Sequence, residues 1–282
     1  FRVQAGAGST GTVPANPVEL TILGQELKAV FFFEQITTAT GTKVIRIGFT
    51  DTSLFLGDPK GAGEADDDLG VFLRNGTGTV LITPQGIAGE FTGDTGLTTA
   101  LANKIGGSFT AALKFQINNL GVAVNERFTF IAADGSEVTQ DLILKKGPFF
   151  RAEALEATIV IGGFSLIGDF AFEKGQLRVT PTSAPVEALS IAASKVRIGA
   201  TADNPSGLIN ASGAIVFLPN GIVAQLTGRA EADGGGISAS AKLGAAINTT
   251  GAEADIRLAV GNNTVTLKVS AARFAFVVQD LA

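Results

Sequence analysis

The stretch Asn75-Gly-Thr-Gly-Thr-Val-Leu-Ile-Thr-Pro-Gln-Gly-Ile-Ala-Gly-Glu-Phe-Thr-Gly93 decides the fold of this chain, because it occurs twice. Its second version is Asn210-Ala-Ser-Gly-Ala-Ile-Val-Phe-Leu-Pro-Asn-Gly-Ile-Val-Ala-Gln-Leu-Thr-Gly228. Both read as a Gly-containing turn, an apolar run, a Pro-x-Gly turn and a second apolar run, which predicts a β-hairpin. A segment of this length that recurs indicates an internal duplication, which has to be recognised before the fold is assigned.

Other segments recur on both sides of this hairpin. At one constant spacing, Leu20, Ile22, Gly24, Leu27, Phe33 and Glu34 are matched by Ile159, Ile161, Gly163, Leu166, Phe172 and Glu173. Lys43–Gly48 is similar to Lys195–Gly199, and Ile117-Asn118 is similar to Ile247-Asn248. We therefore expect a junction strand and linker over residues 1–19, a first β repeat over 20–153 and a second over 154–282. The second copy carries extra residues at 176–191, which we interpret as a longer connection with one extra edge strand.

One strand type stands at the start, the middle and the end of the chain. Phe1-Arg2-Val3 resembles Phe150-Arg151-Ala152, and Phe149–Glu153 resembles Arg273–Phe276. The two copies thus share a junction strand, and strand addition between ends is a specific expectation. The residues predicted to take part in assembly are Phe1, Arg2, Val3, Phe150, Arg151, Phe274 and Phe276.

The remaining pattern predicts an all-β chain. Short alternating runs are separated by Gly, Asn and Asp turn signals, and no segment sustains a 3.6-residue period with helix caps. Two architectures fit these runs: a tandem of sandwich-like or barrel-like modules, and a continuous antiparallel meander or solenoid. We expect tandem antiparallel β-meander or sandwich-like modules that form an elongated rod.

Composition removes most classes of chemistry. The net charge is −5, whereas nucleic-acid binding calls for a basic stripe, and no apolar run is long enough for a membrane-spanning helix. Cys, His, Met, Trp and Tyr are absent, while Phe numbers 20. Without His or Cys, ordinary zinc sites, thiolate chemistry and Ser-His-Asp triads are excluded. Only paired carboxylates remain for catalysis, with Glu34 and Glu173 as candidates; we interpret them as solvent-facing strand-end charges and expect no enzyme.

The sharpest polar cluster lies between Asp58 and Asp68. Its carboxylates on a Gly-containing loop are ligands of the kind that Ca²⁺ prefers. The predicted calcium ligands are Asp58, Glu64, Asp66, Asp67 and Asp68, and no other cofactor is expected. The alternative is a solvated acidic loop, which the absence of an EF-hand pattern and of the cluster from residues 201–207 favours.

The repeated motifs resemble the tandem repeats of very long bacterial extracellular proteins, which are adhesin-like or form cell-surface and filament structures. The motifs that carry the resemblance are Phe31–Glu34, Lys43–Gly48, Asn75–Gly93 and Ile117–Ala123 with their second copies. The resemblance implies secretion to the cell surface, structural or adhesive work, and stabilisation by calcium. Since residue 1 is Phe, we also expect the chain to be a piece of a longer protein.

Together these observations predict a structural segment of an extracellular protein, acting as a rod, spacer or filament subunit joined through β-strand junctions. Its expected partners are further copies of itself or adjacent repeats. The first alternative is an adhesin module that binds a ligand or surface glycan, with calcium as a stabiliser. The second alternative is a β-groove that binds lipid, in which amphipathic strands line an apolar channel.

Overall fold

The computed structural model describes residues 1–6, 16–22, 25–37, 43–58, 69–131, 136–161, 164–199, 206–234, 237–271 and 273–280. The chain divides into two compact units. Unit 1 comprises Phe1–Ile105 and Ala112–Phe150, and unit 2 comprises Gly106–Ala111 and Arg151–Ala282. The expected all-β class is confirmed, since α1 (Thr99–Ile105) is the one helix among the described residues.

Unit 1 is built on an antiparallel sheet with the strand order β1-β3-β4-β5-β6-β7, in which β2 also pairs with β3. The strands are β1 (Arg2–Ala5), β2 (Val18–Ile22), β3 (Gln25–Thr37), β4 (Lys43–Asp58), β5 (Leu69–Thr83), β6 (Gly86–Leu97) and β7 (Gly107–Asn118). Consecutive strands lie next to each other, as short turns between antiparallel strands require.

Unit 2 is built on a sheet with the strand order β10-β11-β12-β13-β14-β15-β18, antiparallel from β11 onward. The strands are β10 (Phe149–Ile161), β11 (Phe164–Leu177), β12 (Val186–Ile198), β13 (Gly207–Leu218), β14 (Gly221–Gly234), β15 (Ile237–Asn248) and β18 (Arg273–Gln279). The chain leaves this sheet after β15 and returns to it as β18, and in unit 1 it leaves the sheet after β7.

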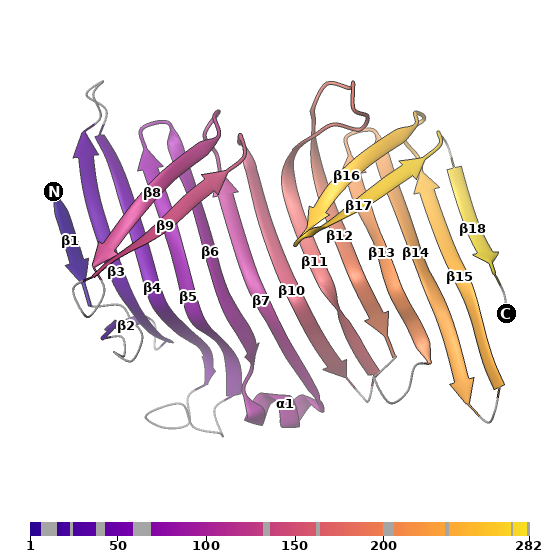
Figure 1. Ribbon diagram of the computed structural model, residues 1–282, viewed down its shortest axis with the longest axis horizontal. Helices are drawn as coiled ribbons and strands as arrows, with labels where there is room; N and C mark the ends of the chain where they lie inside the picture. The colour runs from indigo at the N-terminus through magenta and orange to yellow at the C-terminus, as the bar shows by residue number, and fades with distance from the viewer. Residues whose placement is uncertain are drawn as a thin grey trace. The chain divides into compact units, whose positions relative to one another are not determined.

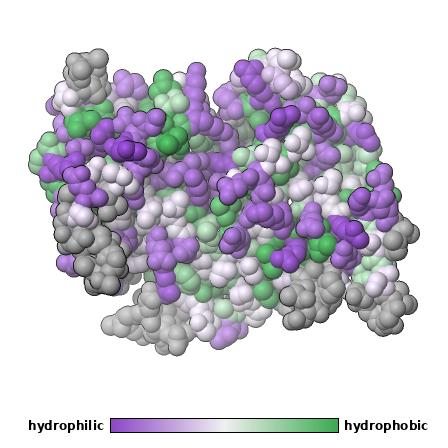
Figure 2. Space-filling view, viewed as in Figure 1, coloured by the Kyte–Doolittle hydropathy of each residue, from purple (hydrophilic) through white to green (hydrophobic). Residues whose placement is uncertain are grey.

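The excursion is a separate two-stranded hairpin in each unit. In unit 1 it consists of β8 (Val124–Ile131) and β9 (Glu137–Leu144), and in unit 2 of β16 (Ala254–Val260) and β17 (Asn263–Val269). Figure 1 shows each hairpin lying obliquely across one face of its own sheet. Many residues on the visible surface in Figure 2 are hydrophilic. Arg127 on β8 and Asp141 on β9 are exposed to solvent.

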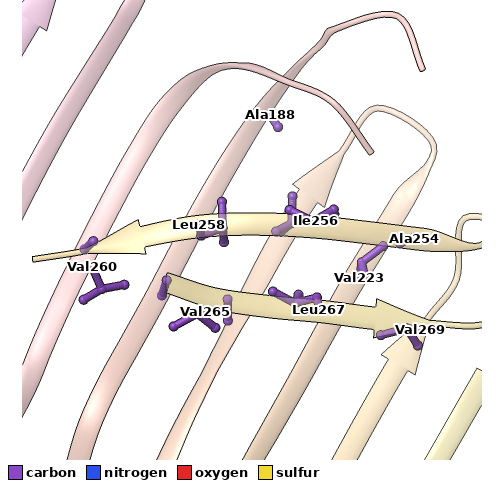
Figure 3. Packing of buried hydrophobic residues seen from close by; sticks show 13 residues of the cluster. Ala188, Val223, Ala254, Ile256, Leu258, Val260, Val265, Leu267 and Val269 are labelled. Atoms are coloured by element: carbon purple, nitrogen blue, oxygen red, sulfur yellow. The ribbon is translucent and has the colours of Figure 1, made fainter. Parts of the chain in front are cut away.

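The core of unit 2 lies between the hairpin and the sheet. Every second residue of β16, from Ala254 to Val260, is buried, as are Val265, Leu267 and Val269 on β17. Figure 3 shows these side chains gathered with Val223 of the sheet. The period of two is what a strand pair with one covered face requires. Burial of this apolar surface holds the hairpin on the sheet.

The core of unit 1 is built in the same way with larger side chains. Phe32, Leu81 and Ala88 on the sheet pack with Phe128 and Leu142 on the hairpin. The side chains of Phe32, Phe128 and Leu142 are among the largest that are fully buried. Of the three successive phenylalanines Phe31–Phe33, Phe32 is buried and its two neighbours are half-buried.

A buried asparagine ends the last sheet strand before each hairpin. The side-chain amide of Asn118 donates to the carbonyls of Val122 and Lys145, at 3.0 and 2.7 Å. The amide of Asn248 donates to the carbonyls of Ala252, Val269 and Ser270. Each amide therefore ties the start of the hairpin to its end. The recurring Ile-Asn pair of the sequence marks this structural anchor.

The hairpin quoted from the sequence is present in both units, as β5–β6 and β13–β14. Thr83 pairs with Gly86 and Leu218 pairs with Gly221, so the two residues between them form the turn. Gly86 and Gly221 have φ values of +146° and +148°, a region that favours glycine. The Pro-x-Gly pattern recurs because this turn needs the glycine.

The register corrects one predicted match. On the sheet of unit 1, Glu34 lies opposite Arg46, whereas Glu173 of unit 2 lies opposite Ser190. Lys43–Gly48 therefore starts β4, but Lys195–Gly199 falls at the end of β12, so their similarity does not reflect matching places. Two alternating strands can share such a short pattern by chance, and only pairing fixes the register.

Two further details differ from the sequence prediction. Residues 176–191 do not add an edge strand, because they contain the end of β11, a connection and the first half of β12, which lies inside the sheet. The helix α1, at Thr99–Ile105, was not expected. It is only seven residues long, which is too short to show the amphipathic period by which a helix is recognised.

Candidate functional site

The strand β18 is an open edge of the sheet of unit 2. It pairs with β15 from Lys242 opposite Gln279 to Asn248 opposite Arg273. No strand among the described residues pairs with its other side. Its backbone N–H and C=O groups on that side are available to another strand.

Between Arg273 and Gln279 at its two ends, the exposed side chains of β18 are apolar. Phe274 is 83% exposed, Phe276 65% and Val278 50%. Soluble proteins usually protect an edge with lysine, proline or a bulge. Residues 274–278, Phe-Ala-Phe-Val-Val, contain no such protection. The predicted residues Phe274 and Phe276 thus lie on an exposed apolar edge strand.

Among the strands that the structure describes, β1 pairs with β3 alone and lies at an edge of the sheet of unit 1. It pairs with β3, where Arg2 lies opposite Glu34 and Val3 opposite Phe33. The backbone N–H of Gln35 donates to the carbonyl of Phe1 at 2.8 Å, and the Phe1 ring lies edge-on to Phe33 at 6.4 Å. Phe1 and Val3 nevertheless remain exposed, at 80% and 44%. The predicted residues Phe1, Arg2 and Val3 thus belong to a short, mainly apolar edge.

The remaining two predicted assembly residues lie on β10. Phe150 is 40% exposed. Arg151 is nearly buried, and its guanidinium donates to the carboxylates of Glu153 and Glu173 and to the carbonyl of Ala259. Burial lowers the pKa of Arg151, but the hydrogen bonds to the two carboxylates outweigh it, so the pKa lies above its ordinary value. These bonds hold Arg151 inside unit 2.

Both candidate carboxylates form ion pairs on the sheet, and the interpretation of them as solvent-facing is wrong. Glu34 accepts from Arg2 at 3.3 Å and lies 3.5 Å from Arg46, with its side chain 18% exposed. Glu173 accepts from Arg151 at 2.8 Å and is 15% exposed. Each glutamate therefore satisfies an arginine from a neighbouring strand, which is a structural use of the carboxylate.

The structure describes only one of the five predicted calcium ligands. Asp58 is the last residue of β4 and pairs with Leu69, while Glu64, Asp66, Asp67 and Asp68 lie outside the described residues. Across the described ranges, no group of three or more His, Cys, Asp or Glu side chains could hold a metal ion. The calcium site therefore stays a prediction.

The residues predicted for assembly did not include Val277 and Val278, which are 38% and 50% exposed on the same edge strand. The signal that could have found them is the uninterrupted apolar run after Arg273, which lacks the charge expected on an edge.

Comparisons of the chain with family models, with curated proteins and with solved structures found no match. In the part of the chain that the structure describes, no helix has the length and apolar character needed to cross a membrane.

Proposed function

We propose that this chain is a structural repeat segment of an extracellular protein, which acts as a rod, spacer or filament subunit. The segments are joined by pairing of β18 of one copy with β1 of the next. The observation that carries the proposal is the open edge of β18, whose Phe274, Phe276 and Val278 are at least half exposed and unprotected. Main-chain hydrogen bonds would supply the affinity, and these side chains the apolar contact.

The matching registers of the two units support a repeated scaffold. Thr52 lies opposite Gly76 in unit 1, and Val196 lies opposite Ala211 at the corresponding pair in unit 2. In each unit, a non-glycine residue with positive φ precedes these positions on both strands; these residues are Asp51, Asn75, Lys195 and Asn210. Coincidence of an unusual backbone conformation at four places favours descent from one repeated unit.

The ion pairs of β1 and β10 support the idea of one strand type at each junction. Arg2 on β1 pairs with Glu34 on β3, and Arg151 on β10 pairs with Glu173 on β11. The two carboxylates occupy matching places in the sequence, so β1 and β10 approach their neighbours in the same way. The extracellular location and the adhesin alternative rest on the sequence resemblance alone.

The test is sedimentation velocity of the full chain over a range of concentrations, with electron microscopy of the same samples. We expect wild-type chains to associate into longer particles. The double variant Phe274→Lys/Phe276→Lys should remain monomeric, because charges on an edge oppose strand addition. Deletion of residues 2–5 should have the same effect from the other edge.

The matched control is Val122→Lys/Ile143→Lys, which places the same two charges on residues that are 62% and 66% exposed away from both edges. This control should associate like the wild type. Long particles formed by the Phe274→Lys/Phe276→Lys variant, or loss of association in both double variants, would contradict the proposal.

A further inference from the structure

Unit 1 contains an apolar pocket on the face of its sheet opposite to the hairpin. Four phenylalanines from four strands line it: Phe31, Phe49, Phe91 and Phe115. Phe32 faces the hairpin and its core, so its neighbour Phe31 faces the other way. The cavity volume is about 410 Å³, which falls in the range of small-molecule sites.

The aromatic rings form a row across the strands. Phe31 lies opposite Phe49, and Phe49 and Phe91 both lie opposite Gly78. A Cβ atom on Gly78 would overlap the Phe49 ring, so the glycine leaves room for it. The ring centroids of Phe49 and Phe91 are 5.7 Å apart, and those of Phe91 and Phe115 are 6.3 Å apart. Across five neighbouring strands, from β3 to β7, the row extends about 19 Å.

One polar side chain in the lining lacks a partner. Thr52 lines the pocket and is only 5% exposed, and its Oγ1 makes no hydrogen bond among the described residues. A buried hydroxyl without a partner destabilises a fold, and its retention calls for an explanation. A ligand with a hydrogen-bonding group at this end of the pocket would satisfy it.

The fold itself does not need this lining, as unit 2 demonstrates. Ala193 lies opposite Phe170 and Gly213, the place that Phe49 holds in unit 1. Leu226 lies opposite Gly213, the place of Phe91, and Ala245 lies opposite Leu226. Val196 takes the place of Thr52. Unit 2 thus keeps the backbone register with neither the aromatic row nor the hydroxyl.

The chemistry of the lining restricts the ligand. No charged side chain is among the residues that line the pocket, so a charged group would lose its hydration without compensation. The row of rings extends across five strands, from β3 to β7, which suits an extended chain better than a compact ring system.

We propose that unit 1 binds an uncharged, extended hydrocarbon chain with one hydroxyl or carbonyl group, such as a fatty alcohol or a fatty acyl ester. The chain lies along Phe31, Phe49, Phe91 and Phe115, and its polar group bonds with Thr52. This site is independent of the assembly edges, so either proposal can fail without the other.

The test is isothermal titration calorimetry of the full chain with 1-decanol, and with decanoate as the charged comparison. We expect saturable binding of one decanol per chain and at least tenfold weaker binding of decanoate. The variant Phe49→Ala/Phe91→Leu/Phe115→Ala, which carries the residues found in unit 2, should lose at least tenfold in affinity.

The second variant, Thr52→Val, separates a binding role from a structural one. Because it removes an unpartnered buried hydroxyl, its midpoint of thermal unfolding without ligand should rise by about 2 to 4 °C. Its affinity for decanol should fall about fivefold, the value of one neutral hydrogen bond. A folded triple variant or Thr52→Val variant that binds decanol as the wild type does would overturn the proposal. So would a wild type that shows no saturable binding.

Discussion

The two units cover the hairpin face of their sheets with different chemistry. In unit 1, Glu126 of β8 points toward the sheet and accepts from Arg46, whose guanidinium also lies 5.8 Å from the Phe128 ring centre. In unit 2, Ile256 holds the place of Glu126 and is fully buried, and Ser190 holds the place of Arg46. The hairpin of unit 1 therefore contacts its sheet through one ion pair beside an apolar core, whereas the hairpin of unit 2 has an apolar side chain at this place.

The two hairpins share a few buried positions. Leu142 and Leu267 are both completely buried in the hairpins, and Asn118 and Asn248 anchor the two hairpin ends. This comparison indicates that buried packing and the hydrogen bonds from the two asparagines to main-chain carbonyls specify the scaffold. The other polar side chains around them can change. The same is true of the sheet face opposite to the hairpin, where Phe49, Phe91 and Phe115 of unit 1 correspond to smaller residues in unit 2.

The largest expected effect tests the shared packing. Leu142→Ala and Leu267→Ala should each lower the free energy of unfolding by about 2 to 5 kcal/mol, because each leaves a cavity in its core. Urea unfolding followed by circular dichroism measures this. The control Ile143→Ala removes a side chain that is 66% exposed and should change stability by less than about 0.5 kcal/mol. A similarly small change for either leucine would show that its hairpin does not pack as described.

The next effect tests the shared anchor. Asn118→Ala and Asn248→Ala should each cost about 1 to 3 kcal/mol, because buried carbonyls lose their donor. Asn248→Ala should cost more, since Asn248 Oδ1 also accepts from the N–H and the hydroxyl of Thr250, whereas Asn118 Oδ1 accepts from the Leu120 N–H. Unfolding in urea is again the measurement, with the outward-facing Asn125→Ala as control. Equal losses for the control and the anchors would refute this role.

A smaller effect tests the difference between the hairpins. A double-mutant cycle with Arg46→Met and Glu126→Gln should give a coupling of about 0.5 to 1 kcal/mol, because both side chains are partly exposed to solvent. The coupling should weaken when the salt concentration is raised. The loss caused by Ile256→Val in unit 2, about 0.5 to 1.5 kcal/mol, should not respond to salt in this way. A coupling of zero at low salt would show that the ion pair of Arg46 and Glu126 does not stabilise unit 1.

The smallest effect concerns pH. The hydrogen bond from Arg127 holds the pKa of Asp141 below its usual value, although partial desolvation acts the other way. Because the folded pKa is the lower one, the pair stabilises unit 1 above the unfolded pKa of aspartate, and this contribution is lost as the pH falls through the folded pKa. In the hairpin of unit 2, Arg257 faces Thr266, so this particular pair has no counterpart there.

The variant Asp141→Asn checks this directly. Its free energy of unfolding should decrease less than that of the wild type between neutral pH and about pH 2. The carboxyl resonance of Asp141, followed by NMR over the same range, should titrate below the usual aspartate pKa. Titration at or above that value would contradict the described hydrogen bond.

Part of this fold was predictable from local sequence signals. The Pro-x-Gly turns at residues 84–86 and 219–221 need only a pattern of turn residues and apolar runs, and both hairpins are present. The all-β class of the chain follows in the same way from the alternation of apolar and polar residues. The edge strands at Phe1 and Phe274 were found because their residues recur at the ends of the predicted copies.

What depends on contacts between distant segments was not predictable. One such contact is made by Asn118, whose partners Val122 and Lys145 are far apart in sequence. The mistaken match of Lys43–Gly48 arose because register is a property of the paired strand. The pocket in unit 1 likewise requires phenylalanines from four strands to meet on one face.

The central claim, that segments join head to tail through β18 and β1, is tested most directly by chemical cross-linking. The chain has no cysteine, so Val3→Cys and Val277→Cys each introduce one thiol, on β1 and β18 respectively. Equal amounts of the two variants are mixed and treated with a short bifunctional maleimide, and the linked peptides are counted by mass spectrometry. If β18 pairs with β1 of the next copy, we expect links between residues 3 and 277 of different copies to outnumber the links between identical positions. Links between identical positions in equal or greater number, or no links at all, would contradict it.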